Sequence, residues 1–299
     1  MKGLIVKGVG GFYRVRPEGA DRSVSYSCRA RGIFKKDGLT PTVGDFVEFE
    51  ALDEEEGVVN AILPRRNLFV RPPIANVDLF IVMIAAAQPA PNLAIVDKLI
   101  VSAEQAQIEI LLCINKTDLV SSESLRRVTD VYAGLYPVIE LSCVCGVGTD
   151  LFPPLLAGKK SALAGPSGVG KSTLINCLRG VADGRAAACG VALETGAISS
   201  KTERGRHTTR HVELFDVGAD GMIFDTPGFT SFAVFGAEAA ELASYYPEMR
   251  ECLGACRFDD CRHLKEPDCA VRAALSDGRI AASRYASYVM LQEEIGKRE

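Results

Sequence analysis

The chain has 299 residues, 47% of them hydrophobic and 24% charged, and a formal net charge of −4. This composition is typical of a soluble globular protein, and the length favours two or three domains. The longest uninterrupted apolar run, Leu79–Ala87, is too short to cross a bilayer, and residues 1–15 lack the apolar core of a signal peptide. We therefore expect a cytoplasmic protein without a membrane partner.

Charge is unevenly distributed near the N-terminus. Residues 1–40 contain nine Lys or Arg and three Asp or Glu, whereas residues 41–60 contain seven acidic residues and no basic one. A basic module inside an acidic protein is a hint of a phosphate-rich partner such as a nucleic acid. A solvated surface without a partner is the alternative.

The first 70 residues have an all-β pattern. Gly, Pro and acidic turns separate five short runs of alternating apolar residues: Leu4–Val6, Phe12–Val15, Val24–Arg29, Phe46–Phe49 and Val58–Ile62. Five short strands in so few residues favour a small barrel, and an OB-fold is the usual solution. We assign residues 1–70 to this barrel.

From residue 77 onward, strand patterns alternate with helical patterns. Strands are expected at 77–87 and 108–115, with helices near 92–105 and 121–134. This alternation favours an α/β fold, a parallel sheet with helices on its faces. The pattern becomes helical after Phe232. We predict an α/β domain over 71–231, with residues 71–76 as a hinge, and a helical domain over 232–299.

A guanine-binding motif ends the second of these strands. It reads Asn115-Lys116-Thr117-Asp118, and the Asp118 carboxylate is suited to accept from both N1–H and N2–H₂ of guanine, a pair of donors that adenine lacks. Asn115 is expected to bond guanine N7, and the stem of Lys116 to lie against the base. The motif therefore predicts selectivity for guanine.

A phosphate-binding loop fits the pattern G-x-x-x-x-G-K-[ST] from Gly165 to Ser172. Its glycines let successive backbone N–H groups point at phosphate oxygens, and the following helix adds the positive end of its dipole. Lys171 is expected to reach the β- and γ-phosphates as part of the catalytic machinery, and Ser172 to ligate Mg²⁺. The predicted nucleotide contacts are Gly165, Pro166, Ser167, Gly168, Val169, Gly170, Lys171, Ser172 and Thr173.

The order of the motifs indicates a circular permutation. In ordinary GTPases the phosphate loop precedes the guanine motif, whereas here Asn115–Asp118 comes first. A third strand end, Ser142-Cys143, also precedes the loop and is expected to offer a backbone N–H to guanine O6. Because chain ends often lie close together, joining them elsewhere can leave a site intact. The rejoined link is Asp150–Lys160.

Two further segments are expected to sense the γ-phosphate. One leads into a strand and contains Thr208 and Thr209, either of which could ligate Mg²⁺; we favour Thr209. The other follows a strand that ends in Asp225, which would hold a Mg²⁺-bound water, while the N–H of Gly228 would touch the γ-phosphate. Loops that order on the γ-phosphate and relax on hydrolysis form a switch.

The residue that would orient the attacking water differs from that of Ras-like enzymes. Those enzymes have Gln directly after the glycine, but this chain has Phe229. His207 lies next to Thr208 in the switch-like loop and is our candidate for this catalytic role. A solvent-exposed loop histidine without a role is the alternative.

A cluster of cysteines near the C-terminus predicts a metal site. The pattern Cys256-x4-Cys261-x-His263-x5-Cys269 supplies three thiolates and one imidazole, a closed tetrahedral set that suits structural Zn²⁺. Cys252 is a fifth candidate ligand, beyond the four that a tetrahedral zinc site requires. Cysteines packed among helices are the alternative.

Together these motifs resemble the RsgA (YjeQ/YloQ) family of circularly permuted GTPases. The resemblance covers nearly the whole chain and includes GDFVEFE and RPPIANVD near the first domain boundary. It implies an N-terminal RNA-binding OB-fold, a permuted GTPase domain and a C-terminal zinc domain. It also implies GTP or GDP, Mg²⁺ and one structural Zn²⁺ as cofactors. Carried over by residue, Cys256, Cys261, His263 and Cys269 match the zinc ligands, and His207 matches the proposed catalytic histidine.

The resemblance also implies binding to the 30S ribosomal subunit and its 16S rRNA, with GTP hydrolysis stimulated there during late maturation. We expect the protein to act as a monomer. Two other functions are considered. One is a zinc-bearing RNA-binding module that uses nucleotide only as a structural ligand. The other is an ATP-dependent kinase, against which Asp118 argues.

Overall fold

The computed structural model describes residues 1–32, 34, 38–182, 212–218, 220–225 and 237–297. The chain divides into two compact units. Unit 1 comprises Met1–Leu79, Cys143–Leu163 and Ser172–Phe229, and unit 2 comprises Phe80–Ser142, Ala164–Lys171 and Thr230–Glu299. The three predicted domains, 1–70, 71–231 and 232–299, stay a prediction.

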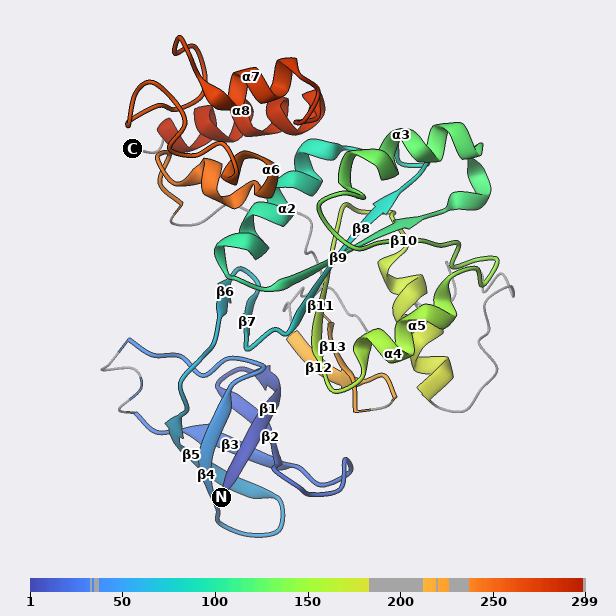
Figure 1. Ribbon diagram of the computed structural model, residues 1–299. Helices are drawn as coiled ribbons and strands as arrows, with labels where there is room; N and C mark the ends of the chain where they lie inside the picture. The colour runs from blue at the N-terminus through green and yellow to red at the C-terminus, as the bar shows by residue number, and fades with distance from the viewer. Residues whose placement is uncertain (33, 35–37, 183–211, 219, 226–236, 298–299) are drawn as a thin grey trace. The chain divides into compact units, whose positions relative to one another are not determined.

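Unit 1 begins with a closed five-stranded barrel, drawn in blue in Figure 1. The strands are β1 (Lys2–Val9), β2 (Phe12–Pro17), β3 (Tyr26–Ala30), β4 (Phe46–Ala51) and β5 (Glu56–Ile62). Their order is β1-β2-β3-β5-β4, and β4 pairs back onto β1; the β3–β5 pair is parallel and the others are antiparallel. This is the strand order of an OB-fold, so the predicted barrel is confirmed.

The segment expected as a hinge forms a short hairpin instead. Strands β6 (Leu68–Val70) and β7 (Pro73–Ala75) pair antiparallel, and Ile74 and Ala75 are fully buried. The Nδ2 of Asn76 donates to the Gly44 carbonyl at 3.0 Å. Gly44 has a φ of +95°, and a Cβ there would lie 2.1 Å from the Ala75 carbonyl oxygen. The hairpin is therefore packed tightly against the barrel.

The remaining strands of unit 1 pair with one another and with the barrel. They are β11 (Lys160–Ala164), β12 (Val212–Asp216) and β13 (Met222–Asp225). Strand β13 pairs parallel with β11 and antiparallel with β12, and β12 pairs antiparallel with β1 of the barrel. Two ion pairs reinforce the last contact: Lys7 with Glu213 at 2.8 Å and Arg16 with Asp216, which is bidentate at 2.9 Å. The short η2 (Thr149–Leu151), α4 (Phe152–Leu156) and the long α5 (Lys171–Ala182) complete the described elements of this unit.

Unit 2 contains the predicted alternation of strands and helices. Its strands are β8 (Leu79–Ala85), β9 (Glu109–Asn115) and β10 (Val138–Glu140), in the order β10-β9-β8, and β9 pairs parallel with β10. Between them lie α2 (Leu93–Gln105), η1 (Thr117–Leu119) and α3 (Ser122–Tyr132). Every residue of β8 is buried, which explains its continuous apolar sequence.

The C-terminal part of unit 2 is helical, as predicted, and the Cys/His segment lies between two of its helices (Figure 1). The elements are η3 (Leu242–Tyr245), α6 (Pro247–Arg250), α7 (Ala270–Ser276) and α8 (Ala282–Gly296). They share an apolar core that includes Tyr246, Met249, Val271 and Tyr288, and α8 packs along α2. Among the described residues, no helix is long and apolar enough to cross a membrane.

A buried ion network joins α8 to α2 and α6. The Arg284 guanidinium donates to Asp97 Oδ1 at 2.7 Å and to Glu248 Oε1 at 2.7 Å, and the Tyr132 hydroxyl donates to the same Asp97 oxygen at 2.8 Å. Arg284 and Asp97 are both fully buried. Charged groups are almost never fully buried unless they are paired.

We predict that Arg284→Met lowers the free energy of unfolding by about 3–5 kcal/mol, because it leaves the Asp97 carboxylate buried without its cation. Urea unfolding followed by circular dichroism measures the loss. Lys98→Met is the matched control, since Lys98 pairs with Glu294 across the same two helices at a partly exposed position. That variant should lose only about 0–1 kcal/mol. Equal losses in the two variants would contradict the assigned importance of the buried network.

Candidate functional site

The guanine motif and the phosphate loop are in direct contact within unit 2. Asn115 ends β9 and is 2% exposed, and its Nδ2 donates to the Val169 carbonyl at 2.8 Å. Gly170 has a φ of +102°, and a Cβ there would lie 2.2 Å from the same nitrogen. The side chain of Asn115 therefore links the two motifs directly.

The phosphate loop has the curled backbone that its glycines predict. Gly165, Gly168 and Gly170 all have φ values in the left-handed range that favours glycine. A Cβ on Gly165 would lie 2.4 Å from the Met83 carbonyl oxygen at the end of β8. The loop is thus seated directly against strand backbone, and helix α5 begins at Lys171. This is the predicted strand–loop–helix arrangement.

Lys171 is held inside the loop. Its Nζ donates to the carbonyls of Gly165 at 2.6 Å and Pro166 at 2.7 Å. Burial lowers the pKa of Lys171 to about 8, because the ammonium is partly removed from water. An anion beside it would raise that pKa again. Phosphate binding and protonation of Lys171 therefore favour each other.

The end of the motif that is predicted to contact the base is braced by two side chains. The Thr117 hydroxyl donates to the Leu141 carbonyl at 3.1 Å, and the Ser142 hydroxyl donates to Asp118 Oδ1. Ser142 is buried, whereas Asp118 is exposed. Lys116 adopts a left-handed backbone with a φ of 65°, and its Nζ donates to the Gln88 carbonyl. The arrangement holds the Asp118 carboxylate at the surface and orients it through Ser142.

The predicted Mg²⁺-binding and switch residues are only partly described. In unit 1, Ser172 is exposed in the first turn of α5, and Asp225 is half-buried at the end of β13. Thr173 is half-buried and Cys143 is buried. The expected roles of four other residues lie outside the described residues: His207, Thr208, Thr209 and Gly228.

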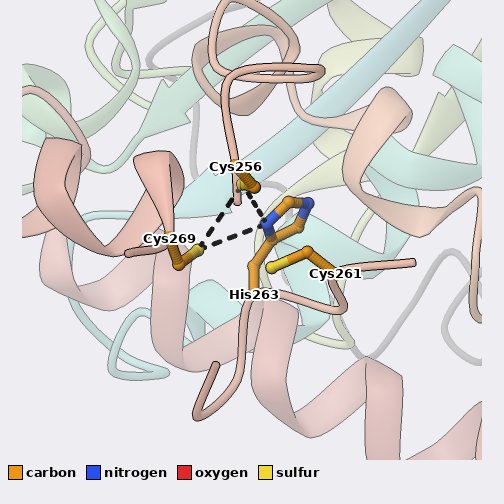
Figure 2. A group of neighbouring side chains, drawn as sticks. All are labelled: Cys256, Cys261, His263 and Cys269. Carbon is orange, nitrogen blue, oxygen red and sulfur yellow. Dashed lines mark hydrogen bonds between the residues drawn. The ribbon is translucent and has the colours of Figure 1, made fainter. Parts of the chain in front are cut away.

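The second candidate site is the Cys/His cluster between α6 and α7. Figure 2 shows the side chains of Cys256, Cys261, His263 and Cys269 converging, and their ligand atoms all lie within 4.8 Å of one another. His263 Nδ1 is 3.5 Å from Cys256 Sγ and 3.4 Å from Cys269 Sγ, and the two sulfurs are 3.9 Å apart. The structure therefore brings together the four residues predicted as ligands.

The separations fit a tetrahedral zinc ion. Sulfur ligands at about 2.3 Å and a nitrogen ligand at about 2.0 Å from Zn²⁺ would be separated from one another by about 3.5–3.8 Å. The three separations among Cys256, His263 and Cys269 are 3.4–3.9 Å and agree with this range, and the Sγ of Cys261 lies within 4.8 Å of the other ligand atoms. Cys252 is buried in the helical core and does not belong to the group. The Cys₃His set is therefore compatible with a closed structural zinc site.

Residues that the sequence analysis did not single out support this loop. The hydroxyls of Tyr285 and Tyr288 on α8 donate to the carbonyls of His263 at 2.7 Å and Arg262 at 2.8 Å. The Glu266 carboxylate accepts from three backbone N–H groups between 262 and 265, and the backbone N–H of Ala270 donates to Cys256 Sγ. Contacts of this kind orient the ligand residues of metal sites. No short sequence motif predicts them.

Comparison with known proteins places the chain in a family. The model of the RsgA GTPase matches residues 62–235, and the model of the RsgA N-terminal domain matches residues 2–59. The chain belongs to the RsgA GTPase family. It is therefore a GTP hydrolase that uses a guanine nucleotide and Mg²⁺, and its fold is a circularly permuted P-loop GTPase with an N-terminal OB-fold.

Relatives of the same family match over almost their whole length. The small ribosomal subunit biogenesis GTPase RsgA of Agathobacter rectalis is 41% identical over 100% of this chain and 99% of the relative. The protein of that name from Caldanaerobacter subterraneus is 42% identical over 100% and 97%. Crystal structures agree: YjeQ from Thermotoga maritima has a TM-score of 0.82 at 32% identity, covering 100% of this chain and 99% of that one. YloQ, a circularly permuted GTPase, has a TM-score of 0.78 at 34% identity over 100% and 96%.

We predict that the purified protein holds one zinc per chain and that Cys261→Ser abolishes this binding. Coordination in such sites is worth roughly 10–16 kcal/mol in apparent free energy, so the loop between α6 and α7 should loosen with the loss. Elemental analysis measures the metal, and hydrogen exchange measures the loop. Cys252→Ser is the control and should keep its zinc, because Cys252 lies outside the group. Wild-type protein without zinc, or loss of zinc from the Cys252 variant, would refute the assigned ligand set.

Proposed function

We propose that this chain is a GTPase of small ribosomal subunit biogenesis. The supporting observation is that relatives carrying that name match over 97–99% of their length, so the barrel, the permuted GTPase and the Cys/His region all correspond. On this proposal the protein binds the 30S subunit and its 16S rRNA and hydrolyses GTP during late maturation. Hydrolysis checks the folding of the rRNA or releases an assembly factor. The protein works as a cytoplasmic monomer.

The nucleotide roles are proposed as follows. Asp118, oriented by Ser142, accepts from the guanine edge, while Asn115 bonds N7 and Lys116 covers the base. The Cys143 backbone N–H bonds O6. The loop Gly165–Thr173 surrounds the phosphates, and its Lys171 exchanges the carbonyls of Gly165 and Pro166 for phosphate oxygens.

Mg²⁺ and the switch complete the proposed site. Ser172 and Thr209 ligate Mg²⁺, Asp225 holds one of its waters, and the N–H of Gly228 touches the γ-phosphate. With Phe229 in place of the water-orienting glutamine, His207 takes over that task. We infer that docking on the ribosomal subunit positions His207 for this task.

The alternative is a zinc-bearing RNA-binding module for which nucleotide is only a structural ligand. The zinc-compatible cluster would suit either function. Sustained release of phosphate over many turnovers in the presence of subunits separates the two, because a structural ligand is not turned over.

We predict that Asp118→Asn weakens GTP binding by at least about 1–3 kcal/mol, the cost of mispairing a desolvated polar group, and improves binding of xanthosine nucleotides. Isothermal titration gives both affinities. Ser142→Ala should weaken GTP binding less, because Asp118 keeps its charge and loses only its orientation. Unchanged GTP affinity in the Asp118 variant would show that this carboxylate does not read the base.

The decisive experiment measures GTPase turnover alone and with purified 30S, 50S or 70S particles. We predict that 30S subunits raise kcat, and supplying a missing transition-state contact can increase it by roughly 10³–10⁵-fold. His207→Ala should abolish the stimulated rate while leaving the affinity for a non-hydrolysable GTP analogue unchanged. A rate that 30S subunits do not alter, with no co-sedimentation, would refute the ribosomal proposal and leave a permuted GTPase with another partner.

A further inference from the structure

The loop that follows β8 contacts the predicted guanine motif at two points. The backbone N–H of Ala86 donates to the Asn115 carbonyl at 2.8 Å, and the Gln88 carbonyl accepts a hydrogen bond from Lys116 Nζ. We call residues 86–89 the β8 loop. The loop and the motif both belong to unit 2, and these two bonds hold them together.

The same loop contacts the predicted phosphate loop. A Cβ on Gly168 would lie 3.5 Å from Cδ of Pro89, an ordinary van der Waals distance. In a guanine nucleotide the ribose joins the base to the phosphates. With the base at Asp118 and the phosphates around Lys171, the sugar has to lie between the two motifs. The β8 loop contacts both motifs and therefore borders the position of the sugar.

The backbone is unusual where Gln88 meets Lys116. Gln88 has a φ of 51° and Lys116 a φ of 65°, and residues other than glycine seldom adopt this left-handed region. Residues held there by the surrounding structure are concentrated at active sites and ligand-binding sites. Here the two residues are bonded to each other, and the ring of Pro89 fixes the φ angle that follows. These contacts restrain the β8 loop next to the site.

The side-chain amide of Gln88 is exposed and makes no hydrogen bond within the part of the chain that the structure describes. Neighbouring polar side chains have partners inside the protein. Asn115 donates to the Val169 carbonyl. The Thr117 hydroxyl donates to the Leu141 carbonyl. An amide offers both a donor and an acceptor, and so does a hydroxyl group. Gln88 is thus free to pair with a hydroxyl of the sugar.

We propose that the β8 loop forms the ribose side of the nucleotide site and that Gln88 is a specificity-determining residue for the sugar. Its amide hydrogen-bonds one ribose hydroxyl, while the bond from Lys116 to its carbonyl holds the loop in place. A group placed to bond a hydroxyl selects against the analogue that lacks it. The protein therefore prefers ribonucleotides to the corresponding deoxynucleotides. The inference rests on the proposed nucleotide roles and adds recognition of the sugar to them.

Isothermal titration of the full-length protein with GDP, 2′-deoxyGDP and 3′-deoxyGDP tests this assignment. In the wild type, the nucleotide that lacks the contacted hydroxyl should bind roughly three- to tenfold more weakly than GDP, the effect of losing one hydrogen bond. The diphosphates are used because hydrolysis cannot then complicate the measurement. The comparison of the two deoxynucleotides identifies which hydroxyl is contacted.

Gln88→Gly removes the amide but keeps the carbonyl that Lys116 contacts, and glycine adopts the left-handed backbone without strain. The variant should bind GDP as weakly as the wild type binds the discriminated deoxynucleotide. The ratio of its affinities for these two nucleotides should fall to about one, because the substitution and the missing hydroxyl delete the same interaction. A purely structural role of Gln88 would weaken all three nucleotides equally and leave the ratio unchanged.

Gln107→Gly is the matched control. Gln107 is also an exposed glutamine of unit 2 with a left-handed backbone, at a φ of 53°, but it precedes β9, whereas the guanine motif lies at the other end of that strand. This variant should keep the GDP affinity and the discrimination of the wild type. Both substitutions remove the same side chain from the same backbone conformation, so a difference between them depends on the site.

The outcomes distinguish this inference from the proposed function. A wild type that binds GDP and both deoxynucleotides equally would overturn it, and so would discrimination that survives in Gln88→Gly. A GTPase rate that 30S subunits do not alter would refute the ribosomal proposal, and an unchanged GTP affinity in Asp118→Asn would refute the assigned base contact. Loss of sugar discrimination in Gln88→Gly alone would still support the role of Gln88 in either case.

Discussion

The hydrogen bond from the Asn115 side chain to the Val169 carbonyl holds the predicted guanine motif against the predicted phosphate loop. It joins the end of β9 to the loop that precedes α5, and Gly170 allows the approach because a Cβ would collide with the same amide. The two partners are 54 positions apart, and the bond requires only that they meet in space. A contact that depends only on proximity in space is compatible with a chain in which the guanine motif precedes the phosphate loop.

The sequence predicted the elements whose information is local. The five strands of the barrel, the alternation of β8, α2 and β9, and the clustering of Cys256, Cys261, His263 and Cys269 are confirmed, because alternation, helical periodicity and short motifs depend on neighbouring residues. The expected hinge at 71–76 was wrong, because Ile74 and Ala75 are buried. A pair of prolines is typical of an exposed linker, so this segment gave no local sign of its burial. Arg284 with Asp97 and Lys7 with Glu213 are 187 and 206 positions apart, and no local pattern distinguishes these charges from ordinary surface residues.

Helix α8 connects two features that were described separately. Arg284 reaches α2 and α6 through the buried ion network, while Tyr285 and Tyr288 hold the carbonyls of the Cys/His loop. One helix therefore supports the loop and attaches it to α2, which lies between the strands β8 and β9. Because a buried charge is costly to leave unpaired, the network tolerates few alternative placements of α8. The contacts from helix α8 accordingly define the position of the Cys₃His loop on unit 2.

The antiparallel pairing of β1 with β12 has a consequence for the order of events on the translating ribosome. Strand β1 is made before its partner strand, because Glu213 follows 206 positions after Lys7. At about 5–20 residues per second, this edge of the nascent barrel waits roughly 10–40 s for its partner. During that time its backbone groups can pair with another chain, a hazard that short edges and charged side chains reduce. The pairing involves only Lys7 and Gly8, and a lysine is one of them. The same charge that later pairs with Glu213 thus protects the unfinished chain.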